Sequence, residues 1–178
     1  MPDLNNEQIE FVSRAIAEFI SDQRATFLGE AEPLNATQRT TVAPFFDDEL
    51  LDSARVAVLT DRRVPNPRLY IALRTLGFHN LPDFSTMAAI TFENVVVSHG
   101  APAEVTLFHE LVHAEQYRQL GVAQFAELYV RGFLSGGSYY GIPLELSAFE
   151  LERRFENDRT LPFSVAMEVR RWIQESRS

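Results

Sequence analysis

The sequence predicts an α+β fold in which helices dominate and one small sheet precedes a central helix. Apolar residues recur at steps of three and four in several long segments, which is typical of amphipathic helices. β-branched residues alternate only in short segments before the central helix, and prolines and glycines mark where helices should begin and end. A chain of 178 residues fits a single domain over 1–178.

The first predicted helix runs from about residue 7 to residue 24, with Asn5 or Asn6 as its cap. Its apolar positions recur at helical spacing: Ile9, Val12, Ile16, Phe19 and Ile20. Residues 29–44 are rich in threonine, asparagine, proline and alanine but have no periodicity. We therefore expect an ordered loop or connector over this segment.

The small sheet should come from two segments of the first hundred residues. Residues 55–60 (RVAVLT) alternate as a β-strand does, and a short helix is expected over 67–76. Residues 87–98 hold two short apolar segments on either side of Glu93 and Asn94, which predicts a hairpin. Together these strands predict one modest sheet, antiparallel or mixed.

The second half of the chain is predicted to be almost entirely helical. The expected helices cover about 104–120, 122–134, 143–155 and 162–172. Gly121 separates the first two, and the glycine-rich run 135–141 separates the second from the third. Pro143 and Pro162 each suit the first turn of the helix that follows.

Composition excludes several classes of function. The formal charge of -9 and the pI near 4.9 argue against a nucleic-acid partner, which needs clustered basic residues. The absence of cysteine excludes disulfides, thiolate metal sites and cysteine nucleophiles. No stretch reaches the ~18 apolar residues of a membrane span, and the N-terminus lacks the pattern of a signal peptide. We therefore expect a cytoplasmic protein with no membrane partner.

Residues 109–113, His-Glu-Leu-Val-His, form the HExxH pattern within a segment predicted to be helical. Residues four apart share one face of a helix, with Cβ atoms about 6 Å apart. The imidazoles of His109 and His113 can therefore converge on one zinc ion at about 2.0 to 2.1 Å each. The alternative interpretation is an amphipathic helix that buries two histidines without a metal.

Glu110 follows His109 by one residue and should lie roughly 100° further around the helix, beside the metal. A carboxylate in that position can take the proton of a water that zinc activates for attack on a carbonyl. The protonated group can then pass the proton to the leaving amine. We therefore predict Glu110 to be the general base.

A third protein ligand is needed, because a catalytic zinc site leaves only its fourth position to water. The two other histidines, His79 and His99, precede the motif. The metzincin pattern fails, because Gln116 and Gln119 stand where its glycine and histidine would be. A downstream carboxylate is therefore expected, from among Glu127, Glu145 and Glu150.

Glu145 is the preferred third ligand. It lies between two apolar stripes of its predicted helix, where a carboxylate would be costly to desolvate unless a cation accompanied it. Glu150 precedes two arginines by three and four residues, and Glu127 precedes Arg131 by four, which are patterns of solvated ion pairs. The alternative for Glu145 is a first-turn carboxylate stabilised by the helix dipole.

Two tyrosines precede Glu145 in the glycine-rich run. Tyr139 or Tyr140 could place a phenol near the metal to stabilise an oxyanion, and we assign this catalytic role to Tyr140. Half-buried packing is the alternative for both. Gln116 and Tyr117 belong either to the surroundings of the metal or to the core, and the sequence does not separate these two possibilities.

Three segments carry a resemblance to a known family: the hairpin AAITFENVVVS, the helix LFHELVHAEQYRQLG and the later IPLELSAFE. The chain resembles the zincin metallopeptidase domain of bacterial proteins, including some associated with extracellular contractile injection systems. The resemblance covers about residues 88–155 and implies a gluzincin-like arrangement with Glu145 as third ligand. Phe92 and Glu93 depart from the family's usual Leu-Gly, and the first 85 or so residues have no counterpart.

These observations lead to the hypothesis of a zinc-dependent hydrolase, a metallopeptidase that cleaves a peptide or protein substrate. A sheet edge beside the motif helix would bind the extended peptide by strand addition. One alternative is a noncatalytic domain that keeps zinc to hold its fold or to recognise a partner. The other is a metal-free helical scaffold with His109 and His113 in its core.

Overall fold

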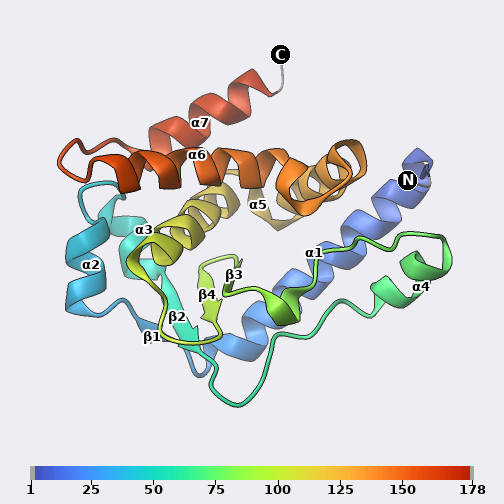
Figure 1. The fold of residues 1–178 in the computed structure, drawn as a ribbon, viewed down its shortest axis with the longest axis horizontal. Coiled ribbons are helices and arrows are strands. Elements are labelled where there is room, and N and C mark those ends of the chain that lie inside the picture. The colour runs from blue at the N-terminus through green and yellow to red at the C-terminus, as the bar shows by residue number, and fades with distance from the viewer. Residues whose placement is uncertain (1–2, 177–178) are drawn as a thin grey trace.

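The computed structural model describes residues 3–176 and confirms the predicted fold class, in which helices dominate and one small sheet precedes a central helix (Figure 1). Its elements in chain order are α1 (Asn6–Leu28), β1 (Glu32–Pro33), α2 (Ala36–Val42), α3 (Asp48–Ser53), β2 (Arg55–Val58), α4 (Leu69–Thr75), η1 (Phe84–Thr86), β3 (Ala89–Phe92), β4 (Val95–Ser98), α5 (Glu104–Gly136), η2 (Tyr139–Gly141), α6 (Pro143–Asn157) and α7 (Val165–Glu175). Within this part of the chain, no helix is both long and apolar enough to span a membrane.

The four strands form one mixed sheet in the order β1-β2-β4-β3. β3 and β4 are the predicted hairpin, while β2 and β4 pair in parallel, with Val56 opposite Val96. The hairpin turns at Glu93, whose φ of 58° lies in the left-handed region that favours glycine. This strand order leaves β3 at an edge of the sheet.

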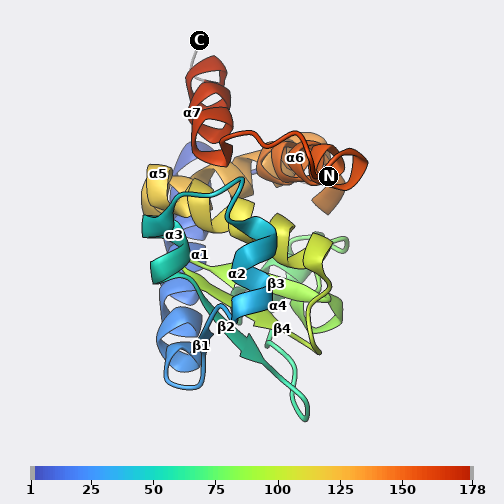
Figure 2. The same ribbon diagram turned by 90° about the vertical axis from the view of Figure 1, so that its left-hand side faces the viewer.

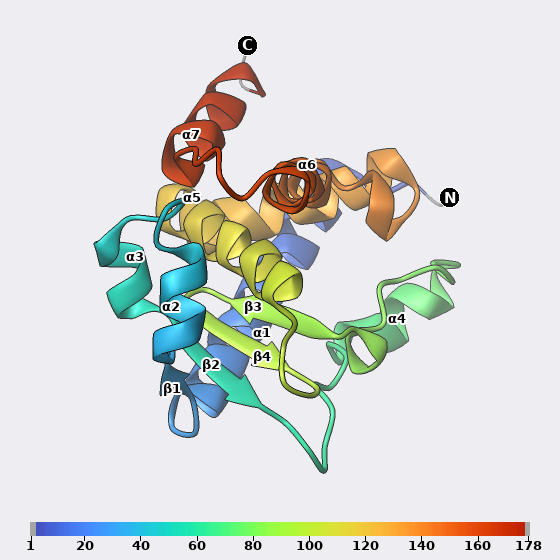
Figure 3. The same ribbon diagram turned by 60° about the vertical axis from the view of Figure 1, so that its left-hand side comes forward.

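The sheet separates two hydrophobic clusters. One cluster joins α1 to one face, through residues such as Ile20 and Phe92, and the other joins α5 to the opposite face, through residues such as Leu111 and Val96. Alternate residues of a strand point to opposite faces, which explains why neighbouring strand residues fall into different clusters. Figures 2 and 3 show α5 on the sheet, with α6 and α7 beyond it.

The predicted break at Gly121 is present inside α5, where φ is 74° and ψ is 162°. The helix therefore consists of two differently directed segments. Phe108 and Leu111 of the first segment pack in the cluster on the sheet, whereas Phe125 and Val130 of the second pack with α1. The break lets one long helix contact both layers.

Two expectations about local structure were wrong. The segment 29–44 is not a connector, because β1 and α2 lie within it. Helix α2 buries Val42 alone, so its sequence shows no apolar periodicity. The helix begins at a capping box formed by Asn35 and Gln38. The last helix begins at Val165 instead of Pro162, because the side chain of Ser164 accepts the Met167 N–H that needs a cap.

Candidate metal centre

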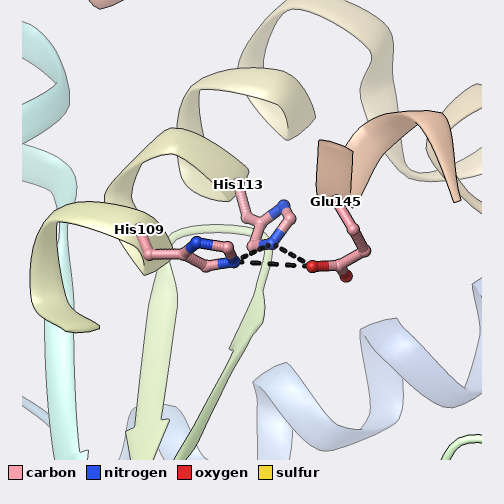
Figure 4. A group of neighbouring side chains, drawn as sticks. All are labelled: His109, His113 and Glu145. Atoms are coloured by element: carbon pink, nitrogen blue, oxygen red, sulfur yellow. Dashed lines mark hydrogen bonds and ion pairs between the residues drawn. The ribbon is translucent and has the colours of Figure 1, made fainter. Parts of the chain in front are cut away.

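His109, His113 and Glu145 meet between α5 and α6 (Figure 4). The two histidines are one turn apart on α5, and their Nε2 atoms lie 3.1 Å from each other. Oε2 of Glu145, from the first turn of α6, lies 3.2 Å from Nε2 of His113 and 3.4 Å from Nε2 of His109. This group could hold a metal ion, since one ligand atom from each residue falls within 4.8 Å of the others.

Glycines allow the close approach of α5 and α6 that brings Glu145 to the histidines. A Cβ on Gly132 would lie 2.5 Å from Cδ of Pro143, which begins α6. One turn later, a Cβ on Gly136 would lie 2.6 Å from the carbonyl oxygen of Gly141. A larger residue at Gly132 would therefore displace the start of α6, and one at Gly136 would displace the turn η2 that precedes it.

All three candidate ligands are buried, at 5% exposure for His109, 6% for His113 and 4% for Glu145. Burial alone would raise the pKa of Glu145, but the two histidines hold that pKa well below its usual range. Burial alone would lower the pKa of His109, but the neighbouring carboxylates of Glu145 and Glu152 raise it to about 10. The cluster thus stabilises positive charge beside the Glu145 carboxylate. A divalent cation can supply that charge in place of protons on the histidines.

The second nitrogen of each imidazole faces an oxygen acceptor. Nδ1 of His113 lies 2.8 Å from Oε1 of Gln116, and the Gln116 amide donates to the carbonyl oxygen of Leu144 at 3.0 Å. Nδ1 of His109 lies 2.7 Å from Oε2 of Glu152. For His113, this contact favours the tautomer with hydrogen on Nδ1, which leaves its Nε2 lone pair available to a metal ion. Nδ1 of His109 lies close to Glu152 without the geometry of a hydrogen bond.

These contacts place Gln116 next to a candidate ligand and also in the buried interior. Glu152 was not predicted from the sequence. It follows Glu145 by seven residues, or two helical turns, and so lies on the same face of α6. That spacing was the available signal.

Glu110 lies beside the cluster, as the helical period predicted. Its carboxylate lines the same cavity as His113 and Glu145. The hydroxyl of Thr91, on the edge strand β3, donates to Oε2 of Glu110 at 2.7 Å. Burial raises the pKa of Glu110, while the neighbouring histidines act against this shift. Glu110 is therefore a buried carboxylate separate from the three candidate ligands.

The structure places Tyr139, and not Tyr140, at the cluster. The Tyr139 hydroxyl donates to Oε2 of Glu145 at 2.7 Å, whereas Tyr140 is 72% exposed and stacks on Phe149. The two belong to the 3₁₀ turn η2, where successive residues point about 120° apart, so only one can face inward. Burial raises the pKa of Tyr139 well above its ordinary value, which keeps the phenol neutral.

The other candidate ligands lie away from the cluster. Glu127 forms the expected surface ion pair with Arg131 at 2.8 Å, and Glu150 is exposed. His99 has a structural role, because its Nε2 accepts from the backbone N–H of Val64 at 3.0 Å. Neither Glu127 nor Glu150 joins His109 and His113.

Comparisons with protein-family models, with curated proteins and with solved structures give no match to this chain. The resemblance to the zincin domain therefore stays a prediction based on the residues of the three segments.

Proposed function

We propose that this chain is a zinc-dependent metallopeptidase of the gluzincin type, with His109, His113 and Glu145 as ligands and Glu110 as general base. One observation carries the proposal: two imidazoles and a carboxylate converge, and a second buried carboxylate, Glu110, lines the same cavity without joining them. Two histidines and one glutamate are the ligand set of several catalytic zinc sites. Imidazole nitrogen in such a set favours zinc over magnesium or calcium.

The number of ligands supports a catalytic site over a structural one. Structural zinc sites are closed by four protein ligands, whereas catalytic sites have three and leave one position to water or substrate. Over residues 3–176, the group that could hold a metal contains three histidines or carboxylates. Glu152 approaches the far nitrogen of His109 and so lies outside that group.

The roles of the protein groups follow from their contacts. Zinc in this site would supply Lewis acidity and lower the pKa of a water molecule toward ~7. Glu110 accepts the proton of the attacking water and delivers it to the leaving nitrogen. Thr91 holds one carboxylate oxygen of Glu110 and leaves the other for this transfer. Tyr139 provides a neutral O–H at the cluster, suited to an oxygen that gains charge.

The edge strand β3 supports a peptide as substrate. It has no strand on its outer side among the described residues, and it carries Thr91 next to Glu110. An extended peptide that paired with β3 would run alongside α5. This geometry favours an extended chain over a compact small molecule.

The test combines metal analysis with cleavage of a broad peptide library by the full chain. We expect one zinc per chain and cleavage by the wild type. Glu110→Gln should retain zinc and lose about 10²- to 10⁴-fold in rate, the usual contribution of a general base. Glu115→Gln is the matched control, because Glu115 is also a buried carboxylate of α5 but does not line the cavity.

Two other outcomes would replace the proposal. Stoichiometric zinc with no cleavage by wild type or Glu110→Gln would indicate a noncatalytic zinc domain. Absence of zinc after expression and purification in zinc-rich medium would indicate a metal-free scaffold, in which the histidines contact Glu145, Glu152 and Gln116 without an ion.

A further inference from the structure

A cavity extends from the candidate metal centre to α1. Glu110, His113 and Glu145 lie at one end, and the side chains of Ile16 and Ile20 form part of the opposite wall. In Figure 4, α1 passes below the three ligands, in faint blue. The two isoleucines are one helical turn apart, so both face the cavity from the same side of α1.

The wall of this cavity away from the metal centre is apolar. Residues of α1, η1, β3 and α5 complete it: Phe19, Phe84, Ala89, Phe92 and Phe125. Burial raises the pKa of the lining tyrosines Tyr117 and Tyr129, so both are neutral. No lysine or arginine is among the described lining residues. On this wall an acidic side chain would find no lysine or arginine to pair with, whereas an apolar one would gain by burial.

The size of the cavity restricts the occupant further. Its volume is ≈ 50 Å³, well below the roughly 150 Å³ of an apolar cavity that binds benzene. The cavity therefore suits a small aliphatic group better than the ring of a benzyl group. Ile20 and Phe92 are buried in the core and resist displacement.

We infer that this cavity, the α1 pocket, receives a leucine-sized aliphatic side chain of the substrate residue next to the cleaved bond. The inference rests on the proposed peptidase function and adds a substrate class to it. It also gives a role to α1, which lies in the segment for which the family resemblance offers no counterpart. Ile16 and Ile20 are then specificity-determining residues.

Paired peptides that differ only in leucine or phenylalanine beside the cleaved bond provide the first test. The zinc-loaded wild type should cleave the leucine peptide with at least tenfold higher kcat/KM, within the range for a few methylenes in an apolar pocket. Ile20→Ala should reduce or reverse this ratio. Val12→Ala is the matched control: Val12 is equally buried on α1 but does not line the pocket, so the ratio should stay unchanged.

A second measurement requires neither zinc nor activity. Met87 lines the pocket, whereas Met167 is exposed, so their ¹³C-methyl NMR signals give a probe and an internal reference. N-acetyl-leucinamide at millimolar concentration should shift the Met87 signal saturably, and N-acetyl-phenylalaninamide should not. Ile20→Ala should admit the phenylalanine compound.

The two measurements separate the pocket from the peptidase function. A selective Met87 shift without cleavage of any peptide would leave the pocket standing and reject the function. Cleavage without a leucine preference, or equal Met87 responses to both compounds, including no response to either, would overturn the α1 pocket.

Discussion

The hydroxyl of Thr91 lies within hydrogen-bonding distance of both the carboxylate and the backbone carbonyl oxygen of Glu110, at 2.7 Å and 2.9 Å. The edge strand β3 is thereby fixed to the motif helix at the proposed general base. Because Glu110 is buried, the orientation of its carboxylate depends on this contact.

Thr91→Val should leave zinc binding intact and lower kcat about tenfold or more, because a hydrogen bond to a charged group contributes about 1.5–3 kcal/mol. Thr91→Ser keeps the hydroxyl and should restore most of the rate. Steady-state kinetics with metal analysis of each variant checks this. Equal rates for the valine and serine variants would show that Thr91 does not position Glu110.

Gly132→Ala should weaken zinc binding at least tenfold, or about 1.4 kcal/mol. The added Cβ would lie 2.5 Å from Pro143 and displace the start of α6, moving Glu145 away from the histidines. Competition with a chelator of known affinity measures the zinc Kd. Gly29→Ala is the control, since a Cβ there meets nothing within 4 Å. If Gly132→Ala and Gly29→Ala bound zinc with equal affinity, the close approach of α5 and α6 could not be what brings Glu145 to the histidines.

Tyr139→Phe removes the hydroxyl that contacts Glu145 and should lower kcat/KM about tenfold, with zinc retained. Tyr140→Phe should change kcat/KM less than about twofold, since that ring lies on the surface against Phe149. Parallel assays of the two variants distinguish the tyrosines. A larger loss from Tyr140→Phe would reverse the assignment.

The Arg118 guanidinium holds the pKa of Asp47 below its ordinary value through hydrogen bonds, one of them 2.9 Å long. A carboxyl with a lower pKa in the folded state stabilises the fold above its unfolded pKa, and this stabilisation is lost as pH falls through the folded value. From about pH 5 to pH 2, the free energy of unfolding should therefore fall more steeply in wild type than in Asp47→Asn.

The difference should stay below about 1 kcal/mol, because both side chains are partly exposed. Asparagine can still accept the Leu50 N–H that Asp47 caps, so the substitution isolates the charge. Urea unfolding at several pH values measures the effect. Parallel curves for the two proteins would show that the ion pair contributes nothing.

Local features of the sequence, such as turn residues, glycines and prolines, predicted much of this structure. The hairpin turn at Glu93, the break at Gly121 and the helix from Pro143 all follow from local chemistry that tertiary packing does not override. Glu145 could be preferred over Glu127 because a carboxylate between apolar stripes requires a cation, and burial of Glu145 agrees with that reasoning.

Features that depend on tertiary contacts were missed. Helix α2 buries one side chain and so leaves no periodic pattern. The choice between Tyr139 and Tyr140 depends on the direction of a single 3₁₀ turn, which adjacent identical residues do not reveal. Glu152 was missed because its contact with His109 is tertiary, and its spacing of seven residues from Glu145 was the only sign in the sequence that both lie on one face of α6.

An anomalous difference map from zinc-loaded crystals of the wild-type chain tests the central claim most directly. The account predicts one peak at about 2.0–2.2 Å from Nε2 of His109, Nε2 of His113 and a carboxylate oxygen of Glu145, with no fourth protein ligand. Absence of a peak at these three residues, or a peak enclosed by four protein ligands, would contradict it.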